Sequence, residues 1–197
     1  MGNRRISRKR LFALNKLGQS STNTAGPGIA PAVVSNTVIR EGHKIITEVT
    51  LDLGTSKATI AAANDEDDVI GISGIEGAYI CQLTPAVNGY ITYVEMACLE
   101  VPTSDTNAQT DIDLRMTNNA ARKYDDDGNG YTSLIAAGGA WALGEVDHYA
   151  VTLGTALDIG ADDLYVYLTC GAAQGGGNIT GGKYVITFEG YAVPDDK

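Results

Sequence analysis

Two short segments of the chain carry residue types, at regular spacing, that could bind a phosphate group or a calcium ion. Residues 177–183, GNITGGK, match the G-x-x-x-x-G-K core of a phosphate-binding loop. The next residue is Tyr184 instead of a serine or threonine, so the hydroxyl that would bind magnesium is missing. The segment beyond it alternates as a strand does, whereas a phosphate loop opens a helix. We therefore expect a glycine-rich hairpin loop and no nucleotide site.

The second segment resembles the first half of a calcium loop, with Asp125, Asp127 and Asn129 at alternating positions before Gly130. The twelfth position, where such loops carry a bidentate glutamate, is Ala136. Consecutive Asp-Gly and Asn-Gly pairs are strong signals for hairpin turns. We expect a turn and assign no metal ligand and no cofactor, and a loose calcium site at 125–129 is the alternative.

Side chains suited to catalysis are few. His43 and His148 are the only histidines, and neither lies beside a serine or cysteine in a nucleophile motif. Glu95 falls in the middle of the most apolar segment, where we expect a hydrogen bond at a subunit contact or a cap, and a carboxylic acid lining a cleft is the alternative. The other acidic residues cluster in turn-like segments and are expected at the surface. The sequence predicts no catalytic residue and no enzyme.

Cysteine and tyrosine supply part of the expected core. Cys81, Cys98 and Cys170 are widely spaced within apolar segments, so we expect small buried hydrophobic residues and no zinc site. The chain has ten Tyr but only two Phe and one Trp, so tyrosine must also fill the aromatic core. A sugar-binding surface is the alternative use for the seven tyrosines on predicted strands, Tyr79, Tyr90, Tyr93, Tyr165, Tyr167, Tyr184 and Tyr191.

The elements that would position these residues are short strands, because apolar residues alternate with period two and no long helix is indicated. The best segments are 44–53, 90–101, 111–116, 164–170 and 183–193, and shorter ones lie at 38–40, 57–63, 78–83, 132–137 and 148–153. In three of these segments one face is mainly apolar, and we expect it inward: Ile45, Thr47, Val49, Leu51 and Leu53; Ile112, Leu114 and Met116; Leu164, Val166, Leu168 and Cys170. Asp111, Asp113 and Arg115 are expected to face outward. Segment 90–101 is apolar on both faces, which predicts a strand in the middle of a packed sheet. About ten strands separated by turns rich in Gly and Asp predict an all-β antiparallel sandwich, specifically a jelly roll. A closed ten-stranded barrel is the alternative.

The charges divide the chain into an arm and a body. The first sixteen residues hold six of the fourteen Lys and Arg and no acidic residue, whereas the other 181 hold eight Lys and Arg and all 24 Asp and Glu. We predict a basic anchoring arm at 1–18, extended or in a short helix, a flexible linker at 19–36 and a single sandwich domain at 37–197. The apolar run at 11–14 is too short for a secretion signal or a membrane span. The expected anchor residues are Arg4, Arg5, Arg8, Lys9, Arg10, Leu11, Phe12, Leu14, Lys16 and Leu17.

The opening residues, MGNRRISRKRL, and segment 163–191 resemble small structural proteins of tailed phages, especially marine podoviruses. The resemblance covers the arm and the last third of the chain, and the middle only in general style. It implies a decoration or cement protein on the head surface of the virion, made in the host cytoplasm. The expected partners are the major capsid protein and neighbouring copies of this chain, as a homo-oligomer and by family analogy a trimer, without a membrane. No site residue comes with the resemblance.

Three other functions are alternatives, of which a β-sandwich enzyme that uses Glu95 and the Asp clusters is the third and ranks lowest. The first is a receptor- or glycan-binding component of a head or tail fibre, with the tyrosines as its site. The second is an arm that binds nucleic acid inside the particle. We rank nucleic acid low as a partner, because the body has 24 acidic against eight basic residues and packed genome would repel it.

Overall fold

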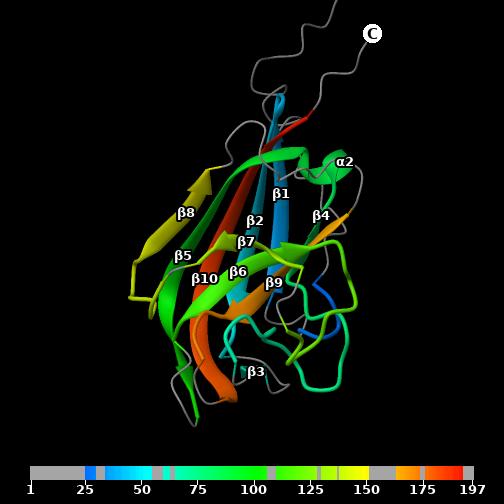
Figure 1. The fold of residues 1–197 in the computed structure, drawn as a ribbon. Coiled ribbons are helices and arrows are strands. Elements are labelled where there is room, and N and C mark those ends of the chain that lie inside the picture. Colours follow the sequence, from blue (N-terminus) through cyan, green and yellow to red (C-terminus); the bar gives the residue numbers. More distant parts are fainter. Residues whose placement is uncertain are drawn as a thin grey trace, which may run out of the picture.

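The structure is a computed structural model that describes residues 25–29, 34–54, 60–62, 65–105, 110–127, 130–136, 138–150, 163–173 and 176–192. Two antiparallel sheets lie face to face, and their strands make up nearly all of the regular structure (Figure 1). The predicted all-β antiparallel sandwich is confirmed. The arm predicted at 1–18 lies outside the described residues.

The two sheets bring together strands that are far apart in the sequence. The larger sheet runs in the order β1 (Val34–Glu41), β2 (Lys44–Asp52), β10 (Gly177–Tyr191), β5 (Tyr90–Ser104) and β8 (Val146–Ala150), and β3 (Ala61–Ala62) pairs with the start of β10. The smaller sheet runs in the order β4 (Cys81–Leu83), β9 (Leu164–Cys170), β6 (Ile112–Thr117) and β7 (Thr132–Ile135).

The one helix in the described part of the chain is the single turn α2 (Pro85–Asn88), between β4 and β5. Thr84 caps it, because its side chain accepts a hydrogen bond from the Val87 amide, and Pro85 occupies the first turn, where its missing N–H costs nothing. Within the described ranges, no helix has the length and hydropathy needed to cross a membrane.

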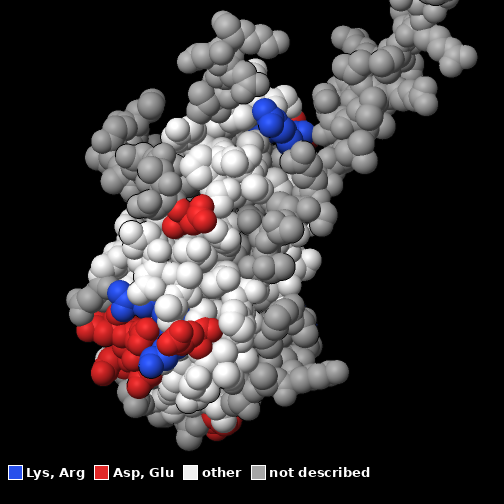
Figure 2. Space-filling view, turned by 90° about the vertical axis from the view of Figure 1, so that its right-hand side faces the viewer, with Lys and Arg blue, Asp and Glu red and all other residues white. Residues whose placement is uncertain are grey.

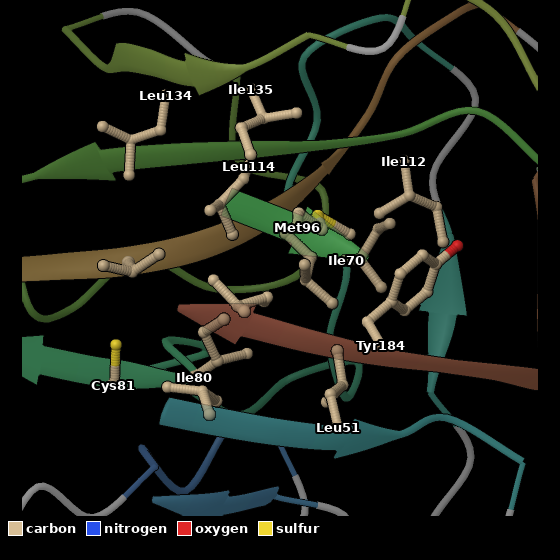
Figure 3. Close-up of a cluster of buried hydrophobic side chains, with 14 of the residues drawn as sticks. Leu51, Ile70, Ile80, Cys81, Met96, Ile112, Leu114, Leu134, Ile135 and Tyr184 are labelled. Atoms are coloured by element: carbon tan, nitrogen blue, oxygen red, sulfur yellow. The ribbon is translucent and has the colours of Figure 1, made fainter. Parts of the chain in front are cut away.

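The core fills the space between the sheets with the apolar residues that alternate along each strand (Figure 3). In β2 the predicted inward face is confirmed, since Ile45, Thr47, Val49 and Leu51 are all buried. The same holds for β6 and β9, whose inward residues are Ile112, Leu114 and Met116, and Val166, Leu168 and Cys170. Trp141 closes the core between β7 and β8, with its Nε1 donating to the Ile112 carbonyl at 2.8 Å.

Residues 25–29 belong to the packed body, although the sequence assigned them to the linker at 19–36. Ile29 is fully buried in the main core. The Gly26 amide donates to the Tyr79 carbonyl at 2.8 Å, and the Gly28 amide to the Gly77 carbonyl at 2.9 Å. A side chain on Gly26 would meet the Gly77 carbonyl oxygen at 2.0 Å, so this close approach requires glycine. Strand β1 also begins at Val34, within the predicted linker.

The outer face of the smaller sheet is covered in part, by segment 65–80 and the connection between β6 and β7. Because Val166 and Leu168 point into the main core, Tyr167 projects from the opposite face, yet it is fully buried. It forms a second small core with Val69 and Ala78, and its hydroxyl donates to the Asn119 carbonyl at 2.6 Å.

Candidate functional site

The ten predicted anchor residues, between Arg4 and Leu17, lie outside the described residues. The structure therefore leaves the predicted capsid-binding arm as a prediction.

The tyrosines divide into a buried and an exposed group. Tyr167 and Tyr184 are fully buried, and Tyr131 packs edge-on against Tyr167 with ring centroids 5.7 Å apart. Burial raises the pKa of both Tyr167 and Tyr184. In contrast, Tyr90 and Tyr191 are direct partners in the register of β5 and β10 and are 42% and 47% exposed. The prediction that tyrosine fills the aromatic core is therefore confirmed for the buried group. The exposed group places two aromatic rings at one end of the larger sheet.

Glu95 lies on the outer face of the larger sheet, within a small group of polar and aromatic side chains. The Tyr93 hydroxyl donates to Glu95 Oε2 at 2.8 Å, and this hydrogen bond is the main cause of a raised Tyr93 pKa. The Tyr93 ring stacks on His148, 5.8 Å away, and His148 is the register partner of Glu95 on β8. The group can donate and accept hydrogen bonds at a surface, and it contains no serine or cysteine nucleophile.

Strand β5 has one buried and one open face. Val94, Met96 and Cys98 point into the core, but Leu99 on the other face is 54% exposed. Segment 90–101 therefore lies inside a sheet as predicted, with β10 on one side and β8 on the other, but within the described residues only one of its two faces is packed. Val146 on the neighbouring β8 is also 53% exposed, so the outer face is apolar near this edge.

Both lysines on the central strands of this face are paired with carboxylates. Lys44 Nζ lies 2.7 Å from Glu189 Oε1, and Lys183 Nζ lies 2.8 Å from Glu100 Oε2 and 3.5 Å from Asp52 Oδ2. Hydrogen bonds to these carboxylates raise the pKa of each lysine. Such exposed pairs add little stability, but they leave no positive excess at these positions.

The glycine-rich segment 177–183 is a strand and not the hairpin loop that the sequence predicted. It forms the first part of β10, with register shifts at Ile179, Gly181 and Lys183. Gly182 has φ of 131°, a conformation that favours glycine. The glycines therefore accommodate β-bulges, and the segment opens no helix that could bind a phosphate.

A turn lies at 123–126, but residues 128 and 129 of the predicted Asp-Gly and Asn-Gly turn lie outside the described residues. The Asp126 amide donates to the Lys123 carbonyl at 3.1 Å, and the Lys123 amide donates to Asp126 Oδ2 at 3.1 Å. Acidic side chains gather near the lower end of the face seen in Figure 2. Burial raises the pKa of Asp68, and the nearby charges of Asp125, Asp65 and Asp127 add to the effect. Among the described residues, no three acidic, histidine or cysteine side chains converge as metal ligands.

A buried charged group lies where the sequence predicted a solvated face. Asp111, Asp113 and Arg115 alternate with the core residues of β6, and Asp111 and Asp113 are only 6% and 4% exposed. Arg115 Nη2 forms ion pairs with Asp113 Oδ2, at 3.3 Å, and with Asp67. Burial, then Asp113, then Glu66 raise the pKa of Asp111. The sequence shows three charges at alternate positions, but nothing in it indicates that segment 65–80 folds beside them.

The three cysteines are buried and free, as predicted. Burial raises the pKa of the Cys81 thiol far above its usual range, and burial also raises that of Cys98. Both thiols are therefore held protonated in the folded state, so neither is a suitable nucleophile.

Comparison of the chain with protein-family models, with curated proteins and with solved structures found no match in any of the three.

Proposed function

We propose that this chain is a non-enzymatic virion structural protein. In this proposal it is a decoration or cement protein that attaches to the major capsid shell through its basic N-terminal arm. The observation that carries the proposal is the nested pairing of its strands, together with the charge contrast between arm and body.

The strand pairs are nested in the sequence, so that the two strands of each inner pair lie between the two strands of the next outer pair. With the edge strand β1 and the short β3 set aside, β2 pairs with β10 and β4 pairs with β9. Inside these pairs, β5 pairs with β8 and β6 pairs with β7. The first of eight strands therefore pairs with the last, the second with the seventh, and so on inward. We infer from this order a jelly roll, a fold that viral capsid and lectin domains use.

Charge supports the arm as the attachment element. The arm carries six positive charges within sixteen residues, while the rest of the chain has eight basic and 24 acidic residues. A basic arm is attracted to an acidic shell surface, and its apolar residues, such as Leu11 and Leu14, add contacts that salt does not weaken. The acidic body keeps neighbouring exposed copies from aggregating.

The described surface favours a binding role over an enzymatic one. His43 and His148 are both at the surface, and the Tyr93–Glu95–His148 group has no nucleophile. The interior between the sheets is filled with apolar side chains instead of a polar cleft. The proposal adds, by analogy with the phage proteins that the chain resembles, assembly on a capsid as a homo-oligomer, specifically a trimer.

The test is co-sedimentation with purified phage heads that lack the protein, across a salt series. We compare the full chain with a variant in which Arg4, Arg5, Arg8, Lys9 and Arg10 are all changed to Gln. A chain in which five other basic residues, Arg40, Lys57, Lys123, Lys183 and Lys197, are changed to Gln is the control matched in charge. The proposal predicts saturable binding that the arm variant loses and the control keeps. Equal binding by the arm variant, or no binding by the full chain, would overturn it.

A second function, glycan binding at a fibre or head surface, is favoured by one observation. Tyr90 and Tyr191 are exposed partners on adjacent strands, and aromatic rings on a β-sandwich are suited to stacking on sugars. A glycan array probed with the full chain and with a Tyr90→Ala, Tyr191→Ala variant separates the two functions. Sugar binding that the double variant loses would favour the fibre role.

A further inference from the structure

Two carboxylates converge over a glycine at the end of the smaller sheet. The Gly171 amide donates to the Asp111 carbonyl at 2.9 Å, so the two residues are neighbours across the sheet. A Cβ on Gly171 would lie 2.2 Å from Asp111 Oδ1 and 2.9 Å from Asp113 Oδ1. The two oxygens are therefore separated by no more than the sum of these distances. A side chain on residue 171 would collide with the Asp111 carboxylate, so only glycine allows both carboxylates to lie against this backbone. The two carboxylates and the Gly171 backbone form a small cradle.

Thr169 completes the cradle on the opposite strand. It is the direct register partner of Asp113, and both project away from the main core because their strand neighbours Leu114, Leu168 and Cys170 fill it. Thr169 has no exposed surface, and its Oγ1 has no hydrogen-bond partner among the described residues. An unpaired hydroxyl at full burial is costly, so its position next to two carboxylates points to a ligand.

The charge around the cradle is negative. Within the described part of the chain, the ion pairs of Arg115 are with Asp67 and Asp113 and not with Asp111. Asp111 Oδ1 has no hydrogen-bond partner among the described residues although the residue is 94% buried. Glu66 adds a further negative charge close to Asp111. A buried carboxylate without a partner is unfavourable unless a proton or a cation neutralises it.

We propose that Asp111, Asp113 and Thr169 bind a calcium ion in this cradle. Calcium takes oxygen ligands at 2.3–2.6 Å, so two of its ligands lie within about 5 Å of each other, as these carboxylate oxygens do. Carboxylate and hydroxyl oxygens from three residues, completed by water, form the ligand set. With only two carboxylates, the site belongs to the weak class, with a dissociation constant of about 10⁻⁴–10⁻³ M.

The proposed site is separate from the calcium-like sequence at 125–129. Asp125 and Asp127 lie in an exposed turn, whereas Asp111, Asp113 and Thr169 come from two neighbouring strands. The inference also stands apart from the virion proposal, because it concerns the stability of the body and requires no capsid.

The test measures the thermal unfolding midpoint of the full chain by circular dichroism, first in chelator-treated buffer. The second measurement adds 10 mM CaCl₂, with NaCl adjusted to equal ionic strength. Calcium should raise the midpoint by at least about 3 °C, since this concentration is about ten or more times the expected dissociation constant. Asp111→Asn should raise the midpoint without calcium, because it removes an unpaired buried charge, and should abolish the calcium shift. Asp125→Asn is the matched control and should keep the full shift.

Thr169→Val, which preserves shape and all charges, provides a second variant and should reduce the shift. Isothermal titration with CaCl₂ should then give binding by the parent chain and by Asp125→Asn, but none by Asp111→Asn. A parent chain whose midpoint responds to pH and not to calcium would mean that Asp111 is neutralised by a proton, and the proposal would fail. A shift lost in Asp125→Asn and kept in Asp111→Asn would move the ion to the turn and equally overturn the proposal.

Discussion

Two buried tyrosines should respond in opposite directions to the same substitution. The Tyr184 hydroxyl is buried in the core beside Ile112 and has no hydrogen-bond partner among the described residues (Figure 3). The Tyr167 hydroxyl, equally removed from solvent, donates to the Asn119 carbonyl at 2.6 Å. Changing either tyrosine to phenylalanine removes one oxygen atom and keeps the ring.

The expected magnitudes follow from this difference. Burying an unsatisfied hydroxyl costs about 1–3 kcal/mol in proteins. Part of this gain is offset by the small void that the missing oxygen leaves, so Tyr184→Phe should stabilise the fold by about 1 kcal/mol. Tyr167→Phe loses a hydrogen bond and leaves a carbonyl unpaired, which should destabilise the fold by about 0.5–1.5 kcal/mol.

Urea unfolding followed by far-ultraviolet circular dichroism measures both values, since secondary structure reports on the whole sandwich. Each variant should keep the m-value of the parent chain, so that the change in midpoint reflects stability alone. Both substitutions keep the aromatic ring, including the edge contact of Tyr184 with Trp141 at a centroid distance of 5.6 Å. The two changes in stability therefore report on the hydroxyl groups and not on ring packing. If Tyr184→Phe destabilises the fold as much as Tyr167→Phe does, the Tyr184 hydroxyl has a partner and the reasoning is refuted.

Three further predictions concern the core, the thiols and the buried carboxylates. Phe188→Ala should destabilise the fold by about 3–5 kcal/mol in urea unfolding, because Phe188 is fully buried on β10 between β2 and β5. Tyr191→Ala on the same strand, 47% exposed, should cost far less, and equal costs would contradict the position of β10 between β2 and β5. A thiol reagent should modify none of Cys81, Cys98 and Cys170 in the folded chain and all three in urea, and rapid labelling without denaturant would exclude their burial. Burial raises the pKa of Asp111 in the folded state above 3.8, so its ionisation lowers stability as pH rises from about 4 through the raised value. In calcium-free buffer, the free energy of unfolding of Asp111→Asn should therefore exceed that of the parent by more at pH 7 than at pH 4. A difference that does not change with pH would show that the charge of Asp111 does not destabilise the fold.

The strands were largely predictable, because a strand with one buried face shows period two in its own sequence. Segment 164–170 was predicted with the bounds that β9 has, and segment 44–53 differs from β2 by one residue. The inward faces followed directly, since shifting a strand by one residue would expose its apolar side chains.

The pairing of the strands could not be predicted in the same way. The neighbours of β10 on the larger sheet, β2 and β5, are about 140 and 90 residues away along the chain, and nothing local encodes such contacts. The open face of β5 was missed for the same reason: Ala97 and Leu99 are apolar, but whether another layer covers them is decided by distant segments. The turn α2 is too short to produce a helical period.

The burial of Asp111 and Asp113 could not be predicted from the sequence either. Residues 111–116 alternate as a half-exposed strand does, and the inward residues Ile112 and Leu114 were correctly predicted. The outward residues Asp111 and Asp113 were expected in water, but Gly171 and segment 65–80 bring other backbone against them. The sequence shows that both residues are charged. The free-energy cost of burying their carboxylates depends on residues more than forty positions away, such as Glu66, Asp67 and Gly171.

The most direct measurement of the proposed role is a cryo-electron microscopy reconstruction of phage heads incubated with the full chain. The account predicts added density on the outer surface of the head, at fixed symmetric positions, with the sandwich standing on the shell and the basic arm lying along the major capsid protein. Density confined to the tail or to the interior of the head, or heads that carry no added density at saturating protein, would contradict it.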